Sequence, residues 1–237
     1  MATHRAAGAG LKLSSTRPLA ADTADYLREL IFIGDLEVGE FLRPERFASE
    51  LRVSITPVRE ALMSLQADGL VELVPRRGFV VLPLTRQDIL DLAWVQALIV
   101  GELTARATRA MDDDDLAELR RRHECLGEAI REGDEKLIDR YSDGFHGLIN
   151  RAAGETKLGW LVTLALHNMP QRFRGATPEW RPEVIDEHER LVVAMTERRA
   201  EDARQIMIEH HLAVGEALAT LLERIREHRG SRLAKDA

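Results

Sequence analysis

The chain has 237 residues, of which 45% are hydrophobic and 31% charged, with a formal net charge of −7 and a single cysteine. This length allows two ordinary domains, each with its own hydrophobic core. The lone Cys125 excludes an internal disulfide and a Cys-x-x-Cys zinc or redox site. The net charge argues against coating nucleic acid by bulk electrostatics, and no apolar run is long enough to predict a membrane span. We expect a cytoplasmic globular protein with no membrane segment.

The charge is unevenly distributed along the chain. Residues 1–83 contain 10 Lys/Arg against 11 Asp/Glu, a net charge of −1, and the remaining residues contain 23 against 29, a net charge of −6. Between residues 43 and 77 every cation is an arginine. Because guanidinium groups suit bidentate contacts with phosphate or guanine, this segment is a candidate for DNA binding.

Residues 1–18 are expected to form a flexible N-terminal arm. A short amphipathic helix follows, with Asp22 or Thr23 as its N-cap and Gly34 as its stop. A second, shorter helix is predicted within Arg43–Val53. Only a brief turn separates it from the next helix.

The stretch "VSITPVREAL" predicts the start of a third helix. Thr56 can cap its free amides, and Pro57 suits the first turn because it lacks an N–H and has a helical φ. The helix is expected to run to about Ala67, with Gly69 ending it. Helical spacing turns Thr56, Arg59 and Met63 outward if the opposite face packs in the core, and that face comprises Val58, Ala61, Leu62 and Leu65.

Two β-prone runs, "LVELV" and "FVVL", follow this helix and are joined by the turn "PRRG". The order of helix, helix, turn, helix and hairpin predicts a winged helix-turn-helix, whose recognition helix reads the DNA major groove with its N-terminal residues. The alternative is an ordinary capped core helix with a solvent-facing arginine.

From Thr85 onward the 3.6-residue period dominates. "TRQD" has the form of a capping box and opens a helix to about Met111, and the acidic run Asp112–Asp115 is expected to start the next. Further helices are predicted at about 134–152, 155–174, 183–198 and 200–228. The predicted fold class is therefore mainly α, with an N-terminal winged helix-turn-helix and a C-terminal bundle of six or seven helices.

Histidines carry the candidate chemistry of this bundle. Asp143 and His146 are three residues apart and therefore share one helix face, on which His188 and His210 from separate helices could converge. Neutral imidazoles with a carboxylate suit zinc, nickel or manganese. The alternative is a metal-free bundle with hydrogen-bonded core histidines, and His211 is expected to face solvent or to lie behind the ligands.

Residues 19–84 resemble the DNA-binding domain of GntR-type bacterial regulators, in the branch similar to the FadR proteins. The resemblance implies an order of domains in which 85–230 form an effector-binding and dimerisation domain and 231–237 a tail. It departs at Ile55, where the family usually has an arginine. The DNA-binding residues that the resemblance implies are Arg46, Ser54, Thr56, Arg59, Arg77 and Gly78. Ile55 is a further candidate at the departing position, where its side chain could contact only a thymine methyl group.

The segments "FHGLINRAAGE", "DEHERLVVAM" and "ARQIMIEHHL" are similar to the FCD ligand domain, in which three histidines and an Asp or Asn hold a metal. This resemblance implies ligand roles for His146, His188 and His210. The family's acidic position is Ser142 here, so we expect Asp143, or else Asp139, to supply the carboxylate.

The residues that usually contact the effector also differ from the family pattern. Gln96 and Val100 occupy the positions of an Arg–Glu pair, so Gln96 is the candidate effector contact and a carboxylate effector would lack the usual arginine.

These features predict a ligand-responsive transcriptional regulator that represses a metabolic operon. We expect a homodimer on a pseudo-palindromic operator, with a small-molecule effector that is a carboxylate or related metabolite. Two other function classes remain open: a metal-dependent helical-bundle enzyme, and an architectural protein that binds DNA constitutively.

Overall fold

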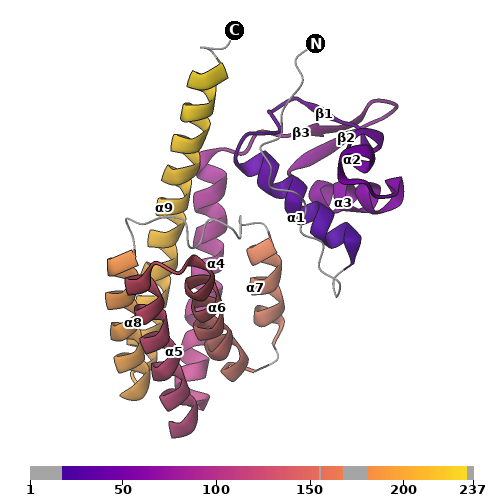
Figure 1. Cartoon of the computed structure of the whole chain (residues 1–237). Helices are drawn as coiled ribbons and strands as arrows, with labels where there is room; N and C mark the ends of the chain where they lie inside the picture. The colour runs from indigo at the N-terminus through magenta and orange to yellow at the C-terminus, as the bar shows by residue number, and fades with distance from the viewer. Residues whose placement is uncertain (1–17, 155, 168–180, 234–237) are drawn as a thin grey trace. The chain divides into compact units, whose positions relative to one another are not determined.

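The computed structural model describes residues 18–154, 156–167 and 181–233 (Figure 1). They divide into two compact units. One contains the residues up to Leu84 together with those from Arg224 onward, and the other spans Thr85–Glu223. The fold class predicted from the sequence is confirmed, since the first unit holds a winged helix-turn-helix and the second is built of helices.

The first unit has the predicted order of elements, with one added strand. A three-stranded antiparallel sheet in the order β1-β3-β2 pairs Phe41 of β1 with Val80 of β3, and Leu73 of β2 with Phe79 of β3. The two-residue β1 was not predicted. The elements are α1 (Leu19–Phe32), β1 (Phe41–Leu42), α2 (Pro44–Leu51), α3 (Ile55–Ala67), β2 (Val71–Val74) and β3 (Gly78–Val81).

Helix α1 starts earlier than the sequence predicted. Its N-cap is Pro18, so the assignment of Asp22 or Thr23 as the N-cap was wrong. Both side chains lie within the helix and are buried. The Thr23 hydroxyl donates back to the carbonyl of Leu19 at 2.8 Å, a bond that satisfies a hydroxyl inside a helix.

Helix α3 packs with the predicted face in the core. Val58, Leu62 and Leu65 have no exposed area, and Ala61 is 1% exposed. The N-cap, however, is Ser54, without a side-chain hydrogen bond to the helix. The predicted capping role of Thr56 was therefore wrong, because Thr56 already lies inside the first turn.

A buried ion pair positions α3 against α1. The Arg28 guanidinium, 6% exposed, donates to Asp25 at 2.6 Å and to Asp68, the C-cap of α3, at 2.7 Å. Loss of one partner from such a buried pair leaves an uncompensated charge, so this contact ties the recognition helix to its support.

The described part of the second unit contains six helices, within the predicted number. Thr85 and Asp88 form the expected capping box, and Asp112 caps the following helix by accepting from the N–H of Asp115. The distal part of the helix predicted at 155–174 lies outside the described residues, and the last helix continues past residue 231, where a tail was predicted. The helices are α4 (Arg86–Ala110), α5 (Asp113–Glu132), α6 (Glu135–Ala152), α7 (Lys157–His167), α8 (Arg181–Thr196) and α9 (Ala200–Leu233).

Glycines allow α4 and α9 to pack closely side by side (Figure 1). A Cβ at Gly215 would lie 2.3 Å from the Cβ of Ala93, and a Cβ at Gly101 would lie 2.6 Å from Ile208. Neither contact leaves room for a methyl group. The close approach buries a continuous apolar core that includes Leu103, Phe145, Val192 and Met207.

None of the helices in the described part of the chain is long and apolar enough to cross a bilayer.

We predict that Gly215→Ala lowers the stability of the helical unit by roughly 1–3 kcal/mol, because Ala93 cannot move without its backbone. Gly127→Ala is the matched control, since a Cβ there meets only the end of Ile185 at 3.9 Å. Helix propensity should make the control neutral or more stable. Thermal melting of both variants measures the difference, and equal melting temperatures would contradict the close packing.

Candidate DNA-binding face and histidine cluster

The N-terminal end of α3 presents the side chains that the sequence assigned to DNA. Ser54, Ile55, Thr56 and Arg59 are all exposed, and Ile55 has 39% of its surface accessible. Arg59 makes no ion pair or hydrogen bond within the described residues, so its guanidinium is available to a base or phosphate. Ile55 can offer only an apolar contact, for example to a thymine methyl group.

Arg46, also assigned to DNA, is neutralised within the protein. It donates to Glu40 at 2.6 Å and to Glu50 at 2.8 Å, and its guanidinium lies 4.9 Å from the centroid of the Phe47 ring. A phosphate would have to compete with two carboxylates. The DNA-binding role of Arg46 thus stays a prediction that this geometry does not favour.

The wing glycine has a structural role besides its predicted DNA contact, which stays a prediction. Arg77 is exposed, with its guanidinium 4.0 Å from the centroid of the Phe41 ring. Gly78 has φ +102°, and a Cβ there would lie 2.8 Å from the carbonyl oxygen of Leu42. Gly78 therefore allows β1 and β3 to approach, which shapes the wing whether or not its backbone contacts DNA.

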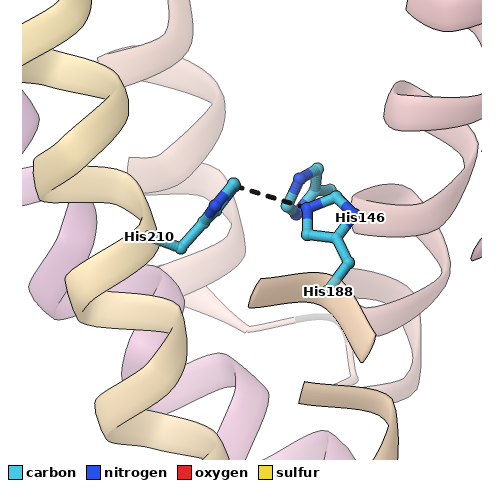
Figure 2. Close-up of side chains that lie close together, drawn as sticks. All are labelled: His146, His188 and His210. Carbon is cyan, nitrogen blue, oxygen red and sulfur yellow. Dashed lines mark hydrogen bonds between the residues drawn. The ribbon is translucent and has the colours of Figure 1, made fainter. Parts of the chain in front are cut away.

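The three predicted histidine ligands meet in the second unit. His146 of α6, His188 of α8 and His210 of α9 each bring a ring nitrogen within 4.8 Å of the others. Figure 2 shows the three rings converging from separate helices. His188 and His210 are buried, and His146 is half-buried. The Nε2 atoms of His188 and His210 are 3.4 Å apart.

Glu187 sets the proton position on His210. The Nδ1 of His210 lies 2.7 Å from the Oε2 of Glu187, so Nδ1–H donates to this carboxylate. In the neutral ring, Nε2 then carries a lone pair that faces His188. A carboxylate behind an imidazole is the usual arrangement that orients a metal-binding histidine.

His188 is held neutral by its surroundings. Burial lowers its pKa well below the ordinary value, and neighbouring His210 and His146 lower it further. Phe145 stacks on its ring with centroids 4.4 Å apart. Its buried Nδ1 has no hydrogen-bond partner among the described residues. Neutral imidazole is the form that binds a metal ion.

The expected carboxylate ligand is not part of this cluster. Asp143 is exposed, and the described group of mutually close ligand atoms contains only the three histidines. With 3.6 residues per turn, position 143 is offset by roughly 60° around the helix from His146, so Asp143 lies at the solvent edge of the face that carries His146. Asp139, the second choice, has a buried Oδ1 and lies nearer that face. The roles of Asp143 and Asp139 stay predictions.

The sequence analysis missed two carboxylates that pair with histidines, Glu187 with His210 and Glu189 with His123. Glu187 directly precedes His188, and the only available signal was this adjacency within "DEHER". His123, which is 7% exposed, pairs through Nε2 with Glu189 at 3.0 Å, and its ring centroid lies 6.3 Å from that of His188. The α5 histidine thus forms an outer neighbour of the cluster.

The predicted effector contact lies on α4. Gln96 is 5% exposed, and Val100, at the other departure from the family pattern, is buried in the apolar core. The effector-binding role of Gln96 stays a prediction.

Comparison with known families accounts for both units. Residues 19–81 match the bacterial regulatory proteins of the gntR family, and residues 91–213 match the FCD domain. The chain belongs to the GntR family, with an FCD domain. It is therefore a DNA-binding transcriptional regulator, a class that differs from the metal-dependent enzyme considered from the sequence.

Relatives of this GntR regulator match over most of their length. The chain is 27% identical over 222 residues to the HTH-type transcriptional regulator YdhC of Bacillus subtilis, covering 92% of this chain and 98% of YdhC. It is 26% identical over 201 residues to the repressor GlaR of Escherichia coli, and the match covers 79% of this chain and 90% of GlaR. The solved structure of E. coli McbR/YncC matches with a TM-score of 0.62 at 24% identity, over 84% of this chain and 97% of McbR/YncC. The two proteins therefore share the fold.

We predict that Gly78→Ala weakens the wing of this GntR regulator, because its Cβ would collide with the backbone of β1. Gly39→Ala is the control: it has a similar positive φ of +83° but no atom within 4 Å of the added Cβ. Gly78→Ala should therefore lower the melting temperature more than Gly39→Ala does. A smaller or equal loss at Gly78 would show that the contact with Leu42 does not constrain the wing.

Proposed function

We propose that this regulator represses a metabolic operon as a homodimer bound to a pseudo-palindromic operator, and that a small metabolite bound in the helical unit changes its affinity for DNA. The observation that carries the proposal is the combination of an exposed, unpaired Arg59 at the start of α3 with a buried three-histidine cluster in an FCD domain. Arg59 would serve DNA binding, and the histidine cluster would serve the response to the metabolite.

Repression is supported by the name of the E. coli relative GlaR, which is a transcriptional repressor. Homodimerisation would place two recognition helices on two half-sites with a fixed spacing. An effector would then act through different affinities for two dimer geometries. Size-exclusion chromatography with light scattering tests the dimer directly.

The histidine cluster supports a divalent metal site. His146, His188 and His210 would hold the ion, while Glu187 keeps the Nε2 lone pair of His210 available. The orphaned Nδ1 of His188 can then carry the ring proton, because both Nε2 atoms face the ligand position. A set of three nitrogens favours zinc or nickel over manganese, which prefers oxygen ligands. When bound, the ion would link three helices and leave a position for an effector oxygen.

Gln96 would hydrogen-bond the effector without adding charge. A carboxylate effector would therefore depend on the metal position rather than on an arginine at this site. The constitutive architectural function is the second candidate, and operator affinity that is indifferent to added carboxylates and metals would favour it.

We predict that Arg59→Ala weakens specific operator binding by roughly 1–3 kcal/mol, the usual contribution of one bidentate contact to a base. Its exposure means that folding should be unaffected. The probe is a duplex enriched from a random library by the wild-type protein, measured by fluorescence anisotropy at fixed salt. Arg190→Ala, at an exposed position of α8, controls for the change in net charge. Equal affinity of Arg59→Ala and wild type would refute the assigned reading face.

We predict that removing metal with a chelator lowers the melting temperature of wild type. A stabilisation of about 2.7 kcal/mol at free metal one hundred times the dissociation constant corresponds to roughly 5–10 °C. His188→Ala should melt lower from the start and respond little to the chelator. His228→Ala, at an exposed position of α9, should respond as wild type does. Melting of wild type that the chelator leaves unchanged, with no metal found by elemental analysis, would rule out the site.

A further inference from the structure

Three non-glycine residues in the described part of the chain have a left-handed backbone, and all three are arginines. Their φ angles are 57° at Arg52, 63° at Arg76 and 59° at Arg198. In this region the Cβ of an L-residue crowds the backbone, so glycine is favoured and a long side chain adopts it only at an energetic cost. Where such an arginine has no compensating interaction in the folded chain, glycine would meet the backbone requirement at lower cost.

Arg198 finds its interaction within the protein. Its guanidinium donates to the carbonyl of Thr108 at 3.2 Å and also to that of Met111, and it lies 3.4 Å from a carboxylate oxygen of Asp113. These contacts satisfy carbonyls at the C-terminal end of α4, which have no partners within the helix. The strained backbone of Arg198 is thus explained by structure alone.

Arg52 has no comparable contact. It is the C-cap of α2, with φ 57° and ψ 42°, and its side chain is exposed. Within the described residues its guanidinium makes no hydrogen bond, ion pair or ring contact. Glycine would meet the backbone requirement of this turn without strain, so the folded chain gains nothing visible from the arginine.

The position of Arg52 in the fold indicates a contact with the DNA backbone. It lies in the turn between α2 and α3, two residues before Ser54, the N-cap of the recognition helix. In a helix-turn-helix, the first helix crosses the DNA backbone and the N-terminal residues of the second contact base edges, so the turn that joins them lies between the backbone and the groove. A guanidinium on the turn is therefore within reach of a phosphate.

The charge of the neighbouring residues supports the same assignment. Arg46 is neutralised by Glu40 and Glu50, and position 55 carries an isoleucine. Without Arg52, the residues that lead into the recognition helix ahead of Arg59 would present no unpaired cation. Arg52 supplies one at the point where the chain enters α3.

We propose that Arg52 is a DNA phosphate contact, and that the strained turn is retained because this arginine holds α3 in register on the duplex. The proposal rests on the proposed DNA-binding function. A phosphate contact positions the protein and carries no sequence information of its own. Arg52 should therefore affect the affinity for all sequences and leave the preference among them unchanged.

The test is Arg52→Gly, because glycine removes the side chain and suits the left-handed backbone. Its melting temperature should equal or exceed that of wild type. Its affinity for the duplex enriched by wild type should fall on the order of eightfold per protomer at 0.1 M salt, which follows from a slope of about 0.9 in log affinity against log salt for one phosphate. The slope of log affinity against log salt should become shallower by about 0.9 per protomer.

Two controls make the result specific. Arg52→Lys keeps the charge and should retain most of the affinity, whereas Arg190→Gln changes the net charge equally in the helical unit and should bind as wild type does. If Arg52→Gly keeps the wild-type affinity and salt slope, or if it unfolds the N-terminal unit, the proposal is overturned. Failure of wild type to enrich any duplex would instead overturn the proposed DNA-binding function and this inference with it.

Discussion

The helical unit depends on packing three imidazoles, two of them buried, where its helices meet. A buried polar ring without a partner destabilises a fold, and a buried positive charge does so more strongly. The structure meets this constraint by keeping His188 neutral, by stacking Phe145 on it and by pairing His210 with Glu187. The Nδ1 of His188 is still without a hydrogen bond among the described residues, and the proposed metal ion would use the lone pairs of the two facing Nε2 atoms.

The N-terminal unit meets a different constraint, which is to bind a polyanion within an acidic chain. Residues 1–83 carry a net charge of −1, which gives little bulk attraction to DNA, so individual guanidinium groups must be placed accurately. Arg28 is used inside the fold, where it ties α1 to α3, and Arg46 is neutralised by two carboxylates. Arg59 and Arg52 remain free at the start of the recognition helix. Affinity should therefore depend on a few contacts and fall steeply with salt.

The sequence predicted features that depend on local periodicity or on capping chemistry. The core face of α3, the capping box of Thr85 and the order of the winged helix follow from such patterns. It failed where tertiary contacts decide the outcome. The two-residue β1 exists only because β3 pairs with it. The start of α1 is instead a local failure, since the helix begins at Leu19 after Pro18 as its N-cap and contains Thr23. The convergence of three histidines agreed with the family resemblance, but Glu187 as the partner of His210 required the structure.

The most direct test of the central claim is native mass spectrometry of the protein purified without added metal. The account predicts a mass excess of one zinc or nickel ion per chain, which disappears in His188→Ala and is retained in His228→Ala. A metal-free mass that stays unchanged when zinc or nickel is added would contradict it. In that case the three histidines would be structural core residues.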